Sequence, residues 1–355
     1  KPYTLYLVPG ISIFLQRLVL MKRSIKAVGL LSGGLDSMLA ARIILEQGIE
    51  VKGISFMTPF FGPEKAERAA EQLEIPLKVL DITQAHWTML RHPRYGYGKG
   101  MNPCIDCHAL MVRKAGEWME KEGADFLFTG EVLGQRPFSQ TRPSLRAVEK
   151  ESGFIDRILR PLSALLLPET RPEQEGLVDR SRLLDMHGRS RKRQMALAKD
   201  YGLNDYPTPA GGCLLTDPIF SIRLKELFSH SSEPQIREVE LLKAGRHFRL
   251  NPEVKCIIGR NKRENEFIEK WAAREDGWAR VMGYPGPMAL ALGRIEESED
   301  WERLAQLCLC YSDAPEDCNV LVQLGQGNRK WKIETTKKPK EFFREWLIQY
   351  APDRT

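Results

Sequence analysis

The sequence predicts an α/β fold: a doubly wound parallel sheet, followed by a smaller α+β domain. The first observation is that short apolar runs alternate with helical patterns near the amino end. Alternation of this kind is typical of a parallel sheet with helices on both faces. The second is a change of character after residue 233, beyond which only short strand-like runs recur.

The elements follow from hydrophobic periodicity. Apolar runs predict strands over residues 27–31, 51–57, 77–82 and 124–130. The intervening patterns predict helices over residues 38–45 and 63–73, and one ending near Lys121. In the second domain we expect strands over residues 288–292, 319–324 and 330–333.

With 355 residues, the chain can bury a sizeable core and divide into several domains. We expect a first, α/β domain over 21–168, a helical segment over 169–233 that carries Cys213, and an α+β module over 234–355. Residues 1–20 look like a poorly ordered extension before Met21. No stretch has the length and apolarity of a membrane span or a secretion signal, so we expect a cytoplasmic protein.

Charge and cysteine content narrow the class further. The formal net charge is +6, and basic residues gather at 189–193, 246–249, 260–263 and 337–340. Such clusters can follow a phosphate backbone, although each alone could be a solvated face. The seven cysteines are odd in number and unevenly spaced, which argues against a disulfide framework.

Residues 32–37 read Ser-Gly-Gly-Leu-Asp-Ser and lie between a predicted strand and a predicted helix. Two glycines allow a tight turn, and the helix start adds partial positive charge, so the segment suits a polyphosphate. It lacks the Gly-Lys-Ser/Thr ending of the Walker loop and the third glycine of the dinucleotide fingerprint.

The string resembles the SGGxDS motif of the PP-loop ATP pyrophosphatases. That resemblance implies cleavage of ATP between the α and β phosphates and activation of a substrate as an adenylate. The implied phosphate ligands are Ser32, Gly33, Gly34 and Ser37. Asp36 would take part in catalysis by holding Mg²⁺ beside the pyrophosphate. Its alternative role is to cap the start of the helix.

Three further segments resemble the tRNA 4-thiouridine synthetases in sequence and in order: residues 129–135, 139–141 and 159–162. With the phosphate loop, this similarity covers roughly residues 21–170. It implies that Gly130 and Gln135 lie near the nucleotide. It also implies that Phe56 and Met57 flank the adenine.

Cys104, Cys107 and Cys213 form the candidate sulfur site. The Asn-Pro-Cys-x-x-Cys and Gly-Gly-Cys strings resemble the cysteine segments of the tRNA 2-thiouridylases, with Cys107 and Cys213 at the matching places. There the pair works by persulfide and disulfide chemistry. Cys104 departs from that pattern. Three cysteines resemble the set with which some PP-loop tRNA thiolases hold a [4Fe-4S] cluster, with one iron open for sulfide.

Alternatives to the cluster stay open at this point. Zinc could be held by the three cysteines and His108. The string over residues 104–108 also matches the c-type haem attachment pattern, which would require export. Cys256, Cys308 and Cys310 lie in apolar strings, so we expect them to be buried and chemically inert.

The prediction is therefore an ATP-dependent sulfurtransferase that thiolates a tRNA uridine. Sulfide or the persulfide of a cysteine desulfurase would be the sulfur donor, and a homodimer is one candidate assembly. Alternatives are a persulfide-based thiolase without a cluster, adenylation of a small molecule, and an RNA-binding sensor. The module from about Pro234 resembles the RNA-binding domain of NFACT proteins, including the turn over 283–287. No THUMP or rhodanese resemblance is evident, which leaves the modified position open.

Overall fold

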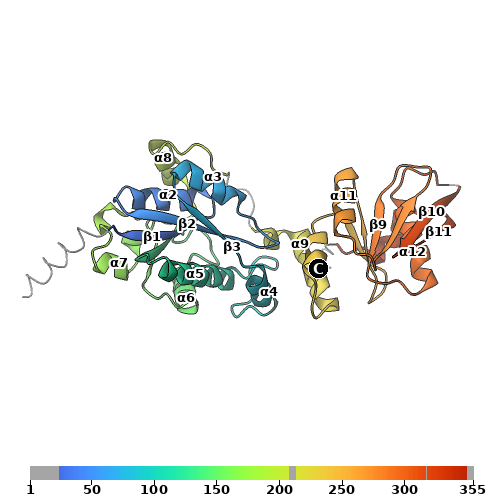
Figure 1. Ribbon diagram of the computed structural model, residues 1–355, viewed down its shortest axis with the longest axis horizontal. Coiled ribbons are helices and arrows are strands. Elements are labelled where there is room, and N and C mark those ends of the chain that lie inside the picture. Colours follow the sequence, from blue (N-terminus) through green and yellow to red (C-terminus); the bar gives the residue numbers. More distant parts are fainter. Residues whose placement is uncertain (1–23, 208–212, 317, 350–355) are drawn as a thin grey trace, which may run out of the picture. The chain divides into compact units, whose positions relative to one another are not determined.

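The computed structural model describes residues 24–207, 213–316 and 318–349. The extension expected over residues 1–20 lies outside them. The described chain folds into two compact units (Figure 1). Residues 24–98 and 102–207 form the first, while 99–101 and the residues from 213 onward form the second.

The first unit is built on a five-stranded sheet with the order β3-β2-β1-β4-β5. All its neighbouring strands are parallel. The strands are β1 (Lys26–Leu30), β2 (Glu50–Met57), β3 (Leu77–Asp81), β4 (Phe126–Thr129) and β5 (Ile158–Leu159). The predicted doubly wound α/β sheet is thereby confirmed, with β1 at its centre.

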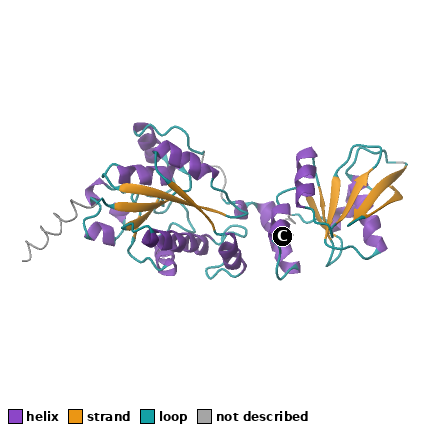
Figure 2. Cartoon of the chain, in the orientation of Figure 1, coloured by secondary structure: helices purple, strands orange, loops and turns teal. Residues whose placement is uncertain are grey.

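Helices cover both faces of this sheet (Figures 1 and 2). One face packs against α2 (Leu35–Leu45), α3 (Glu64–Leu73) and α8 (Lys192–Asp200). The other face packs against α5 (Cys104–Lys121) and α6 (Arg142–Ser152). The remaining helices of this unit are α4 (Thr83–Arg91), α7 (Arg171–Gln174) and the 3₁₀ turns η1 (Ala164–Leu166) and η2 (Arg180–Arg182).

The segment expected to be helical, residues 169–233, contains α7, α8 and the 13-residue helix α9 (Pro218–His230), separated by irregular chain. Gly176 and Gly188 adopt positive φ angles of 69° and 82°, which interrupt the polar pattern. Buried side chains anchor the first part of this segment to the first core, among them Val178, Leu183 and Met186. The division between the two units therefore falls inside the segment 169–233.

The second unit contains a six-stranded antiparallel sheet with the order β11-β10-β8-β9-β7-β6. Its strands are β6 (Arg246–Arg249), β7 (Lys255–Ile258), β8 (Gly277–Val281), β9 (Met288–Leu292), β10 (Asn319–Gln326) and β11 (Arg329–Thr336). The predicted α+β character of this part is confirmed.

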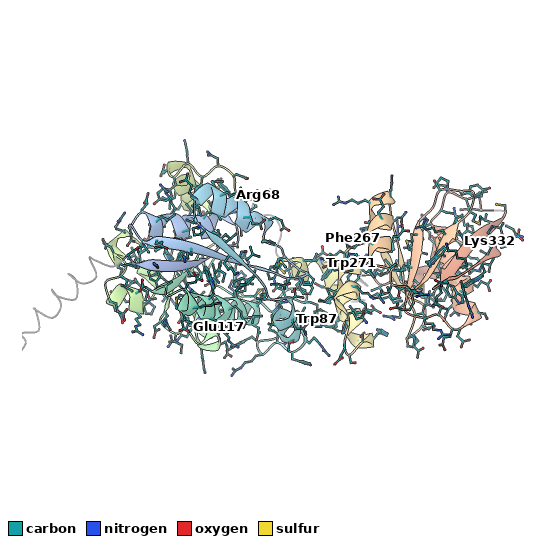
Figure 3. All side chains as sticks on the ribbon, viewed as in Figure 1. Arg68, Trp87, Glu117, Phe267, Trp271 and Lys332 are labelled. Atoms are coloured by element: carbon teal, nitrogen blue, oxygen red, sulfur yellow. The ribbon has the colours of Figure 1, made fainter. Side chains whose placement is uncertain are left out.

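Helices also pack on this second sheet. One face meets α12 (Ser298–Cys310) in a core of buried aliphatic residues. The other face meets α10 (Ile236–Leu241) and α11 (Lys262–Trp271), whose Phe267 and Trp271 are labelled in Figure 3. The unit also holds α9 (Pro218–His230) and the 3₁₀ turns η3 (Leu214–Thr216) and η4 (Lys340–Trp346). Among the described residues, no helix is long and apolar enough for a membrane crossing.

Close approach of the two central strands requires a glycine. Gly29 of β1 pairs in register with Phe128 of β4. A Cβ atom at residue 29 would lie 2.3 Å from the Phe128 ring, which is 1% exposed and has no room to move aside. Only a glycine therefore lets the aromatic ring fill the space over β1.

We expect Gly29→Ala to lower the free energy of unfolding by about 1–3 kcal/mol through overpacking. Thermal unfolding followed by circular dichroism measures the effect. Phe128→Leu shortens the opposing side chain, so the double variant should lose less stability than the two single losses combined. Additive losses would show that the clash is relieved elsewhere.

Candidate nucleotide and cysteine site

The phosphate loop connects the end of β1 to the start of α2 and depends on Gly33. Its φ angle of 73° favours glycine. A Cβ atom there would lie 2.2 Å from the backbone carbonyl of Lys65 in α3. Gly34 is the N-cap of α2, and no side chain of the described chain caps that helix start. The first N–H groups of α2 are thus left for an anion.

Two serine hydroxyls complete the loop. Ser37 Oγ donates a hydrogen bond to the Gly34 carbonyl at 2.8 Å and lies 3.3 Å from Ser32 Oγ. Ser32 Oγ in turn accepts from the Gly34 N–H at 3.3 Å. These contacts fix the turn through its own side chains, and Ser32 is exposed.

Gly130 lies directly against this loop, at the end of β4. A Cβ atom on Gly130 would lie 2.5 Å from the Asp36 carbonyl carbon and from the Ser37 nitrogen. Any larger residue would push the end of β4 away from the start of α2. The structure therefore brings Gly130 to the phosphate loop, and its place beside a nucleotide stays a prediction.

Asp36 occupies a half-buried position among cations and amides. Burial raises the pKa of its carboxyl, while the charge of Arg191 and a contact with the Gln135 amide act in the opposite direction. Arg136 and Gln194 have the same opposing effect. The Oδ1 atom is buried and has no hydrogen-bond partner within the described chain. This oxygen is a free acceptor for a cation such as Mg²⁺.

Arg191 and Gln194 were not predicted as site residues. Gln194 is 1% exposed, and its side-chain amide acts on the Asp36 carboxyl. The Nε atom of Arg191 is buried without a hydrogen-bond partner among the described residues. Buried donors are usually paired, so an unused guanidinium donor near Asp36 favours an anionic ligand. The only signal in the sequence was the basic cluster 189–193.

A pair of interlocked loops brings these residues to the site. His187 bridges to Leu133, and the Gly188 N–H donates to the Leu133 carbonyl at 2.8 Å. Ser163 Oγ accepts from the Leu133 N–H at 3.0 Å and donates to the Met186 carbonyl at 2.7 Å. The chain then enters α8, which packs on α2.

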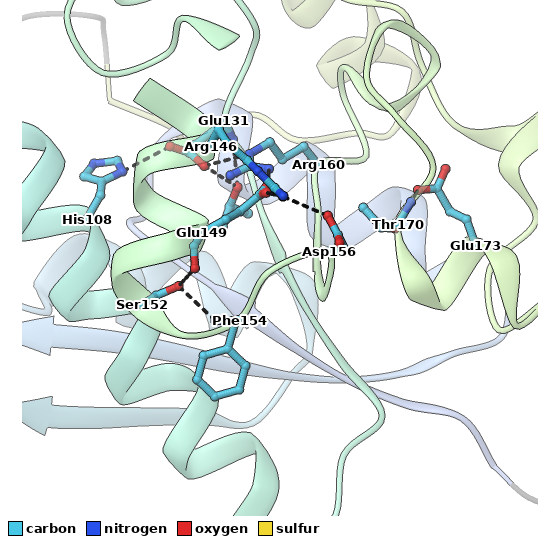
Figure 4. Close-up of polar contacts among 11 residues, drawn as sticks. His108, Glu131, Arg146, Glu149, Ser152, Phe154, Asp156, Arg160, Thr170 and Glu173 are labelled. Atoms are coloured by element: carbon cyan, nitrogen blue, oxygen red, sulfur yellow. Dashed lines mark hydrogen bonds and ion pairs between the residues drawn. The ribbon is translucent and has the colours of Figure 1, made fainter. Parts of the chain in front are cut away.

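A buried ion network lies beside Gly130 (Figure 4). Glu131 is 5% exposed, and its Oε2 accepts from Arg160 Nε at 3.1 Å and from Thr129 Oγ1 at 3.0 Å. Its Oε1 lies 3.1 Å from His108 Nδ1. Arg160 Nη1 also donates to Glu149 Oε1 at 2.6 Å.

The network keeps Glu131 ionised. Burial alone would raise the pKa of the Glu131 carboxyl, but the charge of Arg160 and the contact with His108 outweigh it and lower the pKa to about 2. Because His108 belongs to α5 and Glu131 follows β4, the network ties the helix that carries the cysteines to the phosphate loop.

Cys104 and Cys107 lie in the first turn of α5, where residues three apart share one face. Cys104 is half-buried and Cys107 is 7% exposed. Burial raises the pKa of the Cys104 thiol, and the charge of Arg136 opposes the shift. Since Arg136 also acts on Asp36, one guanidinium lies within electrostatic reach of both the cysteine turn and the phosphate loop.

Cys213 belongs to the second unit, where it precedes η3. Within either unit, no three His, Cys, Asp or Glu side chains of the described residues are grouped to hold a metal ion. The three-cysteine set spans both units, so its convergence stays a prediction. The two glycines before Cys213 lie outside the described residues.

The comparisons with known families divide the chain in the same way. Residues 23–166 match the family model described as thiamine biosynthesis protein (ThiI). The first unit carries a ThiI-type PP-loop domain. Residues 245–347 match the NFACT protein RNA binding domain, so the second unit carries an NFACT-type domain.

Curated relatives match part of the chain. A probable tRNA sulfurtransferase of Thermoanaerobacter sp. (strain X514) is 35% identical over 144 residues, 39% of this chain and 36% of that protein. The tRNA-specific 2-thiouridylase MnmA of Sulfurimonas denitrificans is 34% identical over 116 residues, 29% of this chain and 33% of that protein. The chain thus spans about a third of the length of these relatives.

The chain is also similar to a solved protein, whose structure is described as a crystal structure of a 4-thiouridine synthetase–RNA complex with bound ATP. It is 22% identical to this chain, with a TM-score of 0.33, and the match covers 50% of this chain and 51% of that one.

In the ThiI-type domain, the two residues expected beside the adenine differ in exposure. Phe56 is 5% exposed and packs in the core with Ile54 and Val112, whereas Met57 is 38% exposed at the end of β2. Ser55 lies on the same face of β2 as Met57 and is 6% exposed, so the exposure of Met57 comes from its position as the last residue of the strand. Only Met57 offers an accessible side chain there, and an adenine contact by either residue stays a prediction.

The cysteines expected to be inert are buried in the NFACT-type domain. Cys256, Cys308 and Cys310 are 0%, 0% and 3% exposed. Burial raises the pKa of the Cys308 thiol to about 12 and also raises that of Cys256. Packing is a sufficient explanation for all three.

We expect Glu131→Gln to remove an acid-dependent part of the stability. The Glu131 pKa falls from its ordinary 4.5 to about 2, so its contribution is present above pH 4.5 and disappears as pH falls toward 2. The full contribution is about 3 kcal/mol. Urea unfolding at pH 7 and pH 3 should show that the variant loses less stability on acidification than the wild type does.

The matched control is Glu117→Gln, which changes an exposed carboxylate on the same helix as His108 (Figure 3). Its effect should stay within about 0.5 kcal/mol at both pH values. Equal acid sensitivity of wild type and Glu131→Gln would contradict the assigned role of the network.

Proposed function

We propose that the protein is an ATP-dependent tRNA sulfurtransferase that adenylates a uridine carbonyl and replaces its oxygen by sulfur. The observation that carries the proposal is the linkage of a phosphate loop to a cysteine turn in one unit. Gly130 lies against Asp36, the adjoining Glu131 contacts His108, and His108 follows Cys107. Activation and sulfur transfer need these two groups close together.

The nucleotide would lie at the carboxyl ends of β1, β2 and β4, with its polyphosphate on residues 32–37. The N–H groups at the start of α2 and the Ser32 and Ser37 hydroxyls would bind phosphate oxygens. Asp36 would hold Mg²⁺ through its unpaired Oδ1. Arg191 would donate to the phosphates, and Gln135 and Gln194 would orient Asp36. The adenine would lie against Met57, and Gly130 would lie beside the nucleotide at the phosphate loop.

The chemistry then proceeds in two displacements. The uracil carbonyl oxygen attacks the α-phosphorus of ATP, a new P–O bond forms and pyrophosphate leaves. Loop N–H groups and the Arg191 guanidinium stabilise charge that develops on the phosphates. Hydrosulfide then attacks the activated carbon, the C–O bond breaks and AMP leaves with the original oxygen. A proton is released, and the base carries a C=S group.

Cys104, Cys107 and Cys213 would be the ligands of a [4Fe-4S] cluster, whose open iron would carry the sulfide. The paired cysteines on one helical turn fit two thiolate positions. For the third, the Met101 N–H donates to the Leu215 carbonyl at 3.0 Å within the second unit. Cys104 follows Met101 by three residues and Cys213 precedes Leu215 by two. The backbone contact between Met101 and Leu215 thus lies only a few residues along the chain from Cys104 and from Cys213, and convergence of the three thiolates is part of the proposal.

The NFACT-type domain would bind the tRNA and present the base to the ThiI-type domain. RNA is the ligand class named by the description of the matched domain, and sulfur transfer to tRNA is the activity named for the first unit's relatives. A cytoplasmic location follows from a tRNA substrate. Sulfide or a cysteine desulfurase would supply the sulfur.

The test of the function is ATP- and sulfide-dependent thiolation of unmodified tRNA by the anaerobically purified chain. We expect one AMP and one pyrophosphate per thiolated base. Arg191→Ala should raise the KM for ATP about tenfold, because a charge-assisted contact with phosphate is lost.

Arg193→Ala is the matched control, since Arg193 pairs with Asp185 at 2.7 Å on the surface two residues away. Its KM for ATP should change less than twofold. If tRNA is not thiolated and pyrophosphate is released only when a small-molecule acceptor is added, the substrate is that small molecule and not tRNA. If both arginine variants change the KM for ATP equally, Arg191 does not bind the phosphates.

Iron and acid-labile sulfide analysis tests the cluster. We expect about four irons and four sulfides per wild-type chain, lost in Cys104→Ala, Cys107→Ala and Cys213→Ala. Cys318→Ala is the control, because Cys318 lies in the NFACT-type domain and has no assigned role. Zinc in place of iron would favour the zinc site. Thiolation that needs Cys107 and Cys213 but no iron would favour persulfide chemistry.

A further inference from the structure

Two basic runs that lie far apart in the sequence meet at one tyrosine in the NFACT-type domain. Arg246 begins the edge strand β6, and Lys340 begins the last described helical turn. The Arg246 guanidinium lies 4.5 Å from the centre of the Tyr311 ring, and the Lys340 ammonium lies 5.7 Å from it. Lys338 lies 5.9 Å from the centre of the neighbouring Phe342 ring.

The return of the chain to β6 produces this convergence. Leu347 bridges to Phe248, and the Ile348 N–H donates to the His247 carbonyl at 2.8 Å. Phe343 is fully buried and anchors the segment in the core. The ring centres of Phe248 and Tyr311 lie 6.1 Å apart, so the Tyr311 ring packs against the buried Phe248 ring.

The positive charges near Tyr311 and Phe342 are mostly not paired with carboxylates. Arg249 of the first run forms an ion pair with Glu226, and Lys337 of the second donates to the Ser312 and Ala314 carbonyls beyond α12. Both therefore have structural roles. In the described part of the chain, Arg246, Lys338 and Lys340 form no ion pair with a carboxylate, and Glu341 is the acidic neighbour of Tyr311.

One exposed aromatic ring lies beside these cations: Phe342, which Lys338 contacts, is 46% exposed. Tyr284 is 41% exposed. Tyr284 belongs to the turn over 283–287, which packs against the segment after Tyr311. There the Asp313 N–H donates to the Pro285 carbonyl at 2.9 Å. Uncompensated cations with an adjacent exposed ring suit unpaired nucleotides, whose phosphates and bases need charge and stacking, respectively.

We infer that the Tyr311 surface, defined as Arg246, Tyr311, Lys338, Lys340 and Phe342, binds the backbone of an unpaired tRNA segment. The inference rests on the proposed function, in which tRNA is the substrate. The three cations contact successive phosphates, and Phe342 stacks on a base. Because the contacts are to phosphate and to ring faces, this surface positions the tRNA and does not read its sequence.

The test measures binding of unmodified tRNA to the full chain as a function of salt concentration. We expect Arg246→Ala/Lys340→Ala to weaken binding at least tenfold and to reduce the magnitude of the salt slope by about 1.5 to 2. At saturating tRNA, the kcat for thiolation should stay unchanged while the KM for tRNA rises. Thermal unfolding checks that the variant is folded.

The matched control removes two other lysines of the same sheet. Lys330 lies 5.8 Å from the centre of the Trp278 ring, which reproduces a lysine over an aromatic ring, and Lys332 lies on the edge strand β11 (Figure 3). Lys330→Ala/Lys332→Ala should change affinity less than threefold. An equal loss in both double variants would overturn the inference, because binding would then depend on net charge alone.

Phe342→Ala separates stacking from charge. It should weaken binding of a single-stranded oligonucleotide while leaving the salt slope unchanged. If the wild type binds tRNA and all three variants bind it with the same affinity, the inference is overturned while the proposed function stands. If the wild type does not bind tRNA at all, the proposed function is contradicted, because tRNA is then not the substrate.

Discussion

The buried pairing of Glu131 with Arg160 is the constraint on which the rest of the site depends. Two charges removed from water are costly unless each is well paired, and here the carboxylate has three partners and the guanidinium two carboxylates. The pair fixes the loop after β4. Gly130 can then lie against the phosphate loop, and His108 can orient the first turn of α5.

The proposed reaction is divided between the two units. The phosphate loop, Asp36, Arg191 and the Cys104–Cys107 turn all belong to the ThiI-type unit, so the proposed adenylation and two of the proposed sulfur ligands would share one unit. Cys213 and the Tyr311 surface belong to the NFACT-type unit. In the proposed reaction, a unit that binds tRNA thus also contributes one sulfur ligand, which would couple substrate binding to sulfur delivery.

Strands with continuous apolar runs were predictable, because burial on both faces leaves a pattern in the residues themselves. Met288–Leu292 was predicted to the residue. The helices α4 and α6 were missed, since their faces are largely polar and only Leu90, Leu145 and Val148 mark their buried sides. The stretch after residue 169 is held by scattered apolar contacts with a distant core, which no local period reveals.

The sequence by itself determined the phosphate loop, the parallel sheet and the paired cysteines, because each depends on neighbouring residues within one turn or one strand. Only the tertiary structure decided that Arg191 and Gln194 face Asp36, that Glu131 joins His108 to Arg160, and that Arg246 meets Lys340 at Tyr311. These contacts join segments far apart in the chain. Their geometry follows from packed cores and buried charges, and neither is encoded in local spacing.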